Sequence, residues 1–134
     1  HAVTFTPDVD AVDVDGIGRS IRQDPALAPA GANANFVQVV TQRDAEEPTL
    51  RVRTYEKGVE AETQACGTGA LAAAVVARLR GEVKADTITV LMPGGTLRVG
   101  FTMQAGTIQD LYLEGPAVKV FRGTIDVDPQ TLVG

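Results

Sequence analysis

Cys66, the single cysteine of the 134-residue chain, lies where a thiol could act as an acid or a base. It opens the glycine-rich stretch Cys66-Gly67-Thr68-Gly69, which leads directly into an alanine-rich segment of high helix propensity. N–H groups at a helix start have no partner within the helix, so they bind anions and favour a thiolate. Such a turn suits proton transfer at a carbon next to a carboxylate. A lone cysteine that only fills the core is the alternative on these residues alone.

Carboxylate and amide side chains near strand ends are further candidates. Glu56 continues the strand face that carries Leu50 and Val52, so we expect it to face a cavity or to be paired. If the strand has already ended, Glu56 and Lys57 are both solvated instead. Asn33 and Asn35 share one strand parity, just before the apolar run 36–40. They could make turn hydrogen bonds or belong to a site. His1 alone indicates nothing, because terminal residues are often mobile.

No metal is expected. Residues 8–15 carry four aspartates and resemble a calcium loop superficially. Their spacing is wrong, and the later glutamate that such a loop needs is missing, so a solvated acidic turn is expected. One cysteine and one histidine cannot make a closed zinc site or an internal disulfide framework.

The composition is that of a soluble globular protein, with 44% hydrophobic and 22% charged residues and a net charge of -5. The length corresponds to about one domain. No basic stripe could neutralise phosphates, so nucleic-acid binding is not expected. The longest apolar run, near residues 69–77, is too short to cross a membrane. Without a signal-peptide pattern or paired cysteines, a cytoplasmic protein is expected.

The residue patterns predict two helices and several strands. We expect Asp15 to cap the first helix, at residues 16–23, with Ile17 and Ile21 on one face. The second helix follows Gly69 and should end just before Gly81. Strands are expected at residues 2–6, 35–41, 50–55, 87–92, 96–101, 107–114 and 117–125, the pair at 87–101 forming a hairpin.

The second helix is apolar on nearly its whole circumference between residues 70 and 77. Such a helix must be surrounded by other structure. The predicted fold class is therefore α+β, with a strongly curved, mostly antiparallel sheet or barrel wrapped around one buried helix.

Several segments together resemble one enzyme family. Residues 53–70 are similar to the second cysteine motif of the diaminopimelate epimerases. The Cys-Gly-Thr-Gly sequence alone would be weak, because proline racemases carry a similar one, but the joint pattern is specific and covers nearly the whole chain. The other matching segments, in the same order, are residues 1–5, 8–14, 32–40, 92–97 and 113–123.

This resemblance implies an activity. These enzymes interconvert LL- and meso-diaminopimelate for lysine and bacterial cell-wall synthesis, without a pyridoxal cofactor or a metal. Two domains of like fold face each other, and each contributes one cysteine. One thiolate takes the α-proton from one face of the substrate, and the other thiol delivers a proton to the opposite face.

The same resemblance implies roles for individual residues. Cys66 matches the C-terminal cysteine of the pair. Backbone N–H groups at Gly67 and Thr68 would hold the substrate α-carboxylate. Asn33 matches a substrate-binding asparagine.

Three charged or titratable residues also match. Glu56 corresponds to a glutamate that contacts substrate, and it would help His1 to tune the acidity of the thiols. Lys57 stands where an arginine commonly binds the distal carboxylate. A lysine offers a point charge instead of a planar fork, which weakens bidentate recognition.

A two-thiol mechanism needs two cysteines, and this chain has one. We therefore expect residues 1–134 to form a single domain that resembles the C-terminal half, with the N-terminal half absent. Such a chain is inactive alone and needs an N-terminal epimerase domain as its partner. These residues do not decide whether the chain also forms a homodimer.

Three alternatives follow from the same residues. A proline racemase-like isomerase domain is disfavoured by Glu62-Thr-Gln-Ala before Cys66. A phenazine-biosynthesis-type isomerase is disfavoured by the cysteine itself. A non-catalytic domain that binds a carboxylate or a partner would need a polar surface around Cys66, whereas an apolar patch there would indicate a partner domain.

Overall fold

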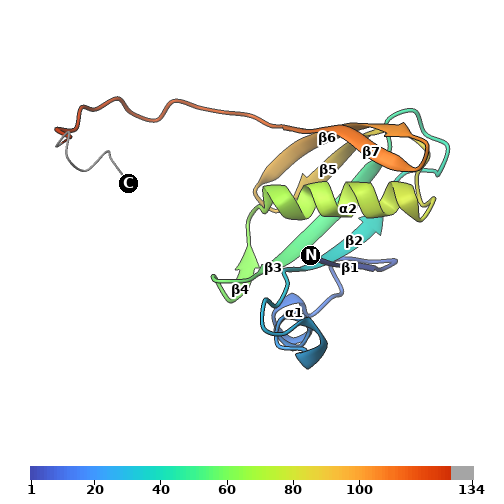
Figure 1. Ribbon diagram of the computed structural model, residues 1–134, viewed down its shortest axis with the longest axis horizontal. Helices are drawn as coiled ribbons and strands as arrows, with labels where there is room; N and C mark the ends of the chain where they lie inside the picture. The colour runs from blue at the N-terminus through green and yellow to red at the C-terminus, as the bar shows by residue number, and fades with distance from the viewer. Residues whose placement is uncertain (128–134) are drawn as a thin grey trace.

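A computed structural model describes residues 1–127, in which seven strands form one curled sheet and a long helix lies along its concave side (Figure 1). The predicted α+β fold class is confirmed. The elements in chain order are β1 (Ala2–Phe5), α1 (Val14–Arg22), the 3-10 turn η1 (Pro25–Leu27), β2 (Ala34–Val39), β3 (Thr49–Glu56), β4 (Ala61–Thr63), α2 (Gly67–Leu79), β5 (Thr87–Met92), β6 (Gly95–Gln104) and β7 (Thr107–Glu114).

The sheet is mostly antiparallel, as predicted. Its strand order is β1-β2-β3-β5-β6-β7, and β4 pairs with β3 off this path. The pairs β1–β2 and β3–β5 are parallel. Parallel neighbours need a long crossover connection. The chain between β1 and β2 contains α1, and the chain between β3 and β5 contains α2.

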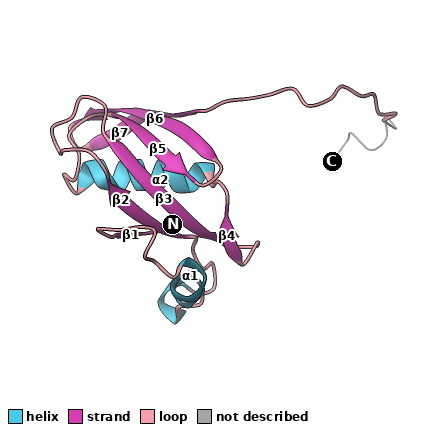
Figure 2. Cartoon of the chain, turned by 180° about the vertical axis from the view of Figure 1, so that it is seen from behind, coloured by secondary structure: helices cyan, strands magenta, loops and turns pink. Residues whose placement is uncertain are grey.

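The inner core lies between α2 and the concave face of the sheet. Small side chains of α2 allow the helix to approach closely, and Ala70, Ala73, Ala74 and Ala77 have no exposed surface. They pack against strand residues such as Val37, Leu50, Val52, Ile88, Val90 and Val99. Leu71 and Val75 are only partly buried, and Leu79 is 57% exposed. Among the described residues, the sheet therefore covers one side of α2 as a half-barrel (Figure 2).

A second core lies on the outer face of the same strands. Phe36 of β2 and Tyr55 of β3 are buried there with Val14 of α1. Neighbouring strand residues point to opposite faces, so β2 and β3 contribute to both cores. Gly18 of α1 packs so closely on Tyr55 that an added Cβ would overlap its side chain.

The start of α1 differs from the prediction. Asp13, not Asp15, is the N-cap, and its Oδ1 accepts a hydrogen bond of 3.0 Å from the Gly16 N–H. The helix begins two residues earlier than predicted, and its buried face carries Val14 and Gly18, with Ile21 packed beside them. Ile17, predicted on one face with Ile21, lies off this face and is 48% exposed.

The predicted strand over residues 117–125 is wrong for this chain. Beyond Glu114 the chain runs extended and away from the sheet to the last described residue (Figure 1). No described strand lies beside it to supply a ladder. Its large apolar side chains are more than 80% exposed: Val118, Val120, Phe121 and Ile125.

The contact between Gly18 and Tyr55 gives a test of the outer core. Gly18→Ala should lower the free energy of unfolding by about 1–3 kcal/mol, because the new methyl group must displace the Tyr55 ring or the helix. Ser20→Ala on the exposed side of α1 is the control and should change stability little. Urea denaturation measures both, and equal stability of the two variants would contradict the close packing.

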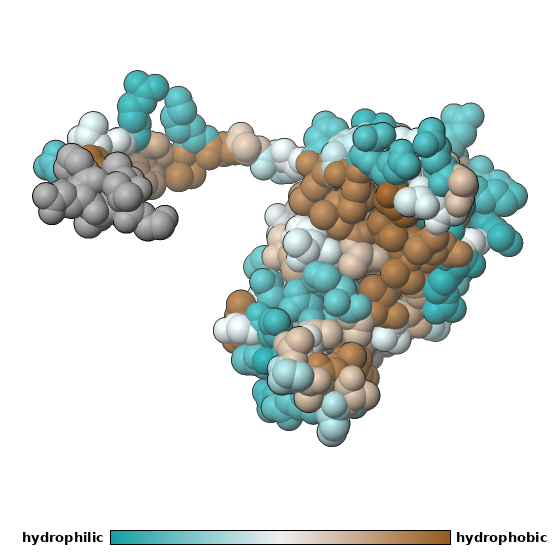
Figure 3. Space-filling model, viewed as in Figure 1, coloured by the Kyte–Doolittle hydropathy of each residue, from teal (hydrophilic) through white to brown (hydrophobic). Residues whose placement is uncertain are grey.

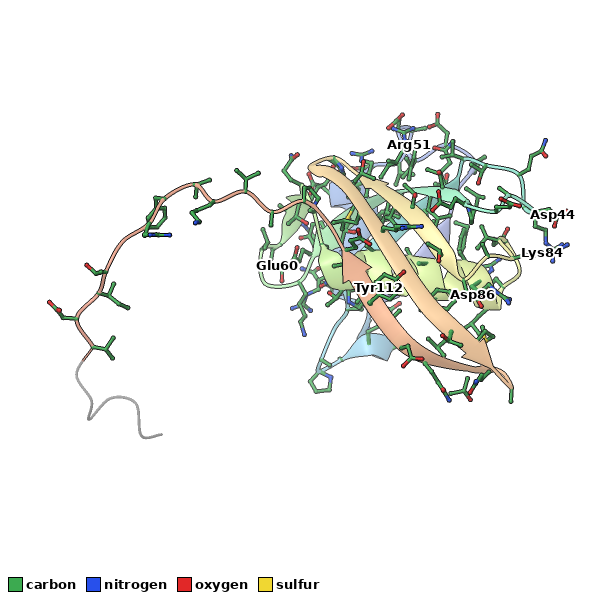
Figure 4. The ribbon with its side chains drawn as sticks, turned by 90° about the horizontal axis from the view of Figure 1, so that it is seen from above. Asp44, Arg51, Glu60, Lys84, Asp86 and Tyr112 are labelled. Atoms are coloured by element: carbon green, nitrogen blue, oxygen red, sulfur yellow. The ribbon has the colours of Figure 1, made fainter. Side chains whose placement is uncertain are left out.

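An ion pair on the outer face gives a pH-dependent test. Arg51 donates two hydrogen bonds of 2.8 Å to Asp10. This bonding lowers the pKa of the Asp10 carboxyl from its ordinary value of 3.8. The ionised carboxylate therefore stabilises the fold above that value, and the contribution is lost as the pH falls through the lowered pKa. Figure 4 shows Arg51 at the edge of the domain.

Asp10→Asn should consequently lower stability slightly at neutral pH, and the difference from the parent should vanish in acid. Denaturation curves at several pH values measure this effect. Asp126→Asn removes the same charge from the extended segment and is the control. The same pH dependence in both variants would rule out the pair as the cause.

Candidate functional site

Cys66 is the N-cap residue of α2, as the glycine-rich sequence predicts. Its backbone is extended, and its thiol side chain does not cap the helix. The first helical hydrogen bond runs from Ala70 N–H to the Cys66 carbonyl at 2.9 Å. The N–H groups of Gly67, Thr68 and Gly69 precede this bond, so they have no partner within the helix. An anion-binding helix start and a thiol thus share one turn.

Cys66 is buried, with 6% of the residue exposed. Two polar side chains contact its sulfur. The Asn33 Nδ2 donates to Sγ at 3.5 Å, and the Thr68 hydroxyl lies 3.6 Å away. The Asn33 Oδ1 accepts from the Lys57 backbone N–H at 2.9 Å. Asn33 therefore joins the end of β3 to the thiol.

Glu56 belongs to β3, so the alternative of a strand that ends before it is wrong. Its side chain is partly buried, and Oε2 accepts a hydrogen bond of 3.0 Å from the Thr63 hydroxyl. Thr63 lies on β4, a three-residue strand that is too short for sequence patterns to reveal. The carboxylate is therefore held between two strands.

Lys57 is exposed, and its ammonium donates to the Ala30 carbonyl at 3.1 Å. Only its backbone contacts Asn33. The side chain thus lies on the loop before β2. A lysine has four rotatable carbons, so it can leave such an exposed contact at little cost.

Asn35 links His1 to the inner face of the sheet. Asn35 is 1% exposed, and its Nδ2 lies 3.2 Å from His1 Nδ1 and 2.9 Å from the Ala2 carbonyl oxygen. Its Oδ1 accepts from the Thr54 hydroxyl at 3.0 Å. Sequence reasoning missed this buried role. The sequence did contain a signal for it. Asn35 precedes Val37 by two residues on the same strand, so both side chains point to the same buried face.

The aspartates of the acidic segment 8–15 are exposed, as predicted, and three of them also make specific hydrogen bonds. Asp10 pairs with Arg51, Asp13 caps α1, and the Asp15 carboxylate accepts from the Glu62 N–H at 2.9 Å. These interactions fasten the segment to the sheet.

An unpredicted ion pair joins the same region to the cysteine motif. Arg53 donates to Glu62 at 2.6 and 2.7 Å and to the Val9 carbonyl at 3.0 Å. The bond to Glu62 raises the pKa of the Arg53 guanidinium.

Over residues 1–127, no cluster of three or more histidine, cysteine or acidic side chains is arranged to hold a metal. The same part of the chain has no helix long and apolar enough to cross a membrane.

An apolar patch lies beside the cysteine turn. It consists of Leu111 and Leu113 on one face of β7, which are 44% and 41% exposed, whereas Tyr112 between them points to the opposite face. A Cβ on Gly67 would lie 3.0 Å from Leu113, so the patch reaches the first residue of α2. Hydrophobic residues gather on this face of the molecule (Figure 3). A patch of this kind indicates an interaction surface.

Comparison with known proteins gives concordant matches. A family model described as "Diaminopimelate epimerase" matches residues 1–120. A relative from Methanocella arvoryzae, named diaminopimelate epimerase, is 47% identical over 128 residues, which are 96% of this chain. Relatives of the same name from Aquifex aeolicus and Chlorobaculum tepidum are each 43% identical over 93% of it. The chain spans 41%, 42% and 46% of the lengths of these three relatives.

The glycines of the turn give a matched test of the site. A Cβ on Gly69 would overlap Asn35 Oδ1 and lie 3.2 Å from Cys66 Sγ, whereas one on Gly67 would meet only the flexible end of Leu113. Gly69→Ala should lower the free energy of unfolding by about 1–3 kcal/mol and change the rate at which iodoacetamide labels Cys66. Gly67→Ala should change both quantities less. Equal effects of the two variants would contradict the close approach of Asn35 and Cys66.

Proposed function

Because this chain belongs to the diaminopimelate epimerase family, we propose that it forms one half of an epimerase that interconverts LL- and meso-diaminopimelate. In this proposal Cys66 is one of two acid–base thiols. The supporting observation is the turn itself, where Cys66 Sγ, the Asn33 amide and the free N–H groups of Gly67 and Thr68 lie together.

The proposed reaction proceeds by transfer of the α-proton. The substrate α-carboxylate accepts hydrogen bonds from the N–H groups of Gly67 and Thr68. When Cys66 acts as the base, the α-C–H bond breaks, the proton joins Sγ, and the electron pair stays on the carbon next to the carboxylate. Oriented N–H groups stabilise that developing charge. A second thiol then protonates the opposite face, because one group cannot reach both faces of a bound substrate.

The neighbouring side chains would position the substrate and the thiol. Asn33, already bonded to Sγ, binds the substrate near its α-carbon. Glu56 contacts the substrate and, with His1, tunes the acidity of the thiols. Lys57 binds the distal carboxylate after its ammonium leaves the Ala30 carbonyl. The reaction needs no pyridoxal cofactor, since thiols on both faces exchange the proton. Both thiols must be reduced, which fits a cytoplasmic enzyme.

The partner in this proposal is an N-terminal domain that carries the second cysteine. Two surfaces support it. The apolar patch of β7 lies at the cysteine turn, and the extended segment after Glu114 exposes Val118 and Val120 to water. Apolar surfaces of this kind are normally covered in a functional assembly. The relatives are more than twice as long as this chain, which also supports pairing with a second domain.

An α-hydrogen exchange assay tests the proposal. LL-diaminopimelate in D2O is incubated with this chain alone and then with an added N-terminal half from a relative. We expect exchange and epimerisation only after addition. Cys66→Ala should lower the rate by about 10²–10⁴-fold, the usual contribution of a positioned acid or base.

Each other outcome identifies a different error. Exchange by the chain alone would show that Cys66 needs no second thiol. An assembled complex without exchange of diaminopimelate would contradict the substrate. Exchange of proline by that complex would favour a proline racemase-like enzyme, and binding of a carboxylate without exchange would favour a binding domain. Thr41→Ala, in the loop that follows β2, is the control for nonspecific effects of substitution.

A further inference from the structure

Asn35 is a buried polar residue whose hydrogen bonds fix the orientation of its amide. The Ala2 carbonyl oxygen can only accept, so the group 2.9 Å from it must be the Asn35 NH2. The Asn35 Oδ1 then faces the Thr54 hydroxyl, which donates to it at 3.0 Å. Reversing the amide would place a carbonyl oxygen against a carbonyl oxygen. The geometry therefore permits one orientation.

This orientation determines how the amide meets the His1 ring. The Asn35 NH2 has hydrogens and no lone pair to offer, and it lies 3.2 Å from His1 Nδ1. The Asn33 carbonyl oxygen is a third neighbour of this NH2, at 3.4 Å, but Nδ1 is closer. The second hydrogen therefore goes to Nδ1, which accepts it. A neutral imidazole that accepts at Nδ1 carries its hydrogen on Nε2. The hydrogen bond that Nδ1 accepts from Asn35 thus determines that Nε2 carries the ring hydrogen.

Asn35 also touches the cysteine turn. Its Oδ1 and Cys66 Sγ both border the space that a Cβ on Gly69 would occupy. Asn33, two residues earlier in the chain and just before β2, donates to Sγ. One short chain segment therefore carries both the partner of His1 and the partner of the thiol.

We propose that Asn35 is a positioning residue that holds the His1 imidazole as its Nε2–H tautomer beside the Cys66 turn. The ring then presents a donor at Nε2 and no free acceptor at Nδ1. Asn35 acts through His1 and does not touch the substrate. Its effect on proton transfer rests on the epimerase function proposed above, whereas the tautomer does not.

The tautomer is measurable on this chain without substrate. The chain has one histidine, so ring nitrogen signals in a 15N NMR spectrum belong to His1. At a pH where the ring is neutral, we expect hydrogen on Nε2 and a bare Nδ1. Asn35→Asp replaces the donor by an acceptor and should move hydrogen to Nδ1. Asn35→Ala should give a mixture of the two tautomers.

Thr54→Val is the matched control. It removes the hydrogen bond that the Asn35 Oδ1 accepts and loosens the same buried network, but it leaves the Ala2 contact that orients the amide. It should lower stability without moving the ring hydrogen. In the assembled enzyme, Asn35→Ala should slow α-hydrogen exchange by about tenfold, as for other outer partners that orient a functional histidine. Thr54→Val should leave the exchange rate nearly unchanged.

The outcomes separate the two proposals. Hydrogen on Nδ1 of the parent chain would overturn the tautomer assignment, even if no variant folds. A folded Asn35→Asp with an unchanged ring would overturn the control by Asn35. Equal slowing by Asn35→Ala and Thr54→Val would reduce Asn35 to a structural role. Absence of exchange in the parent assembly would contradict the epimerase function and leave the ring measurement valid.

Discussion

The position of Cys66 depends on how closely α2 approaches the sheet. Glycine and alanine line the buried side of this helix, and Ala70, Ala73 and Ala74 leave no surface exposed. Side chains of this size bring the helix backbone near the strands, and alanine loses no rotamer freedom on burial. A larger residue on this side would lift the N-terminus of the helix away from Asn33. The small side chains that pack the core therefore also determine the geometry of the site.

The alternation of side chains along β2 and β3 places apolar packing on one face of the sheet and polar contacts on the other. Phe36 and Tyr55 face α1 and contribute apolar packing, while Asn35 and Thr54 face α2 and supply hydrogen bonds. A shift of register by one residue would exchange these faces. The outer core thus holds the strands in the register that the polar groups require. This explains how buried amides can lie beside an apolar core at acceptable cost.

Local signals in the sequence predicted much of this arrangement. Glycines beside Cys66 indicated a helix start there, and the turn at Pro93 indicated the β5–β6 hairpin. Other features depend on distant contacts. The buried face of α1 depends on its packing against Tyr55 of β3, and the contact of Lys57 with Ala30 joins segments far apart in sequence. Residues 117–125 have a strand pattern, but a strand also needs a neighbour.

We expect the His1 side and the Cys66 side of the site to differ in local stability, because His1 precedes the edge strand β1. It is a four-residue edge strand, paired with β2 alone and linked to it through the long crossover that contains α1. Edge segments with few contacts open at a fraction of the free energy of global unfolding. Cys66, in contrast, is anchored by the central helix. We therefore expect the His1 side of the site to open at a lower free-energy cost than the Cys66 side.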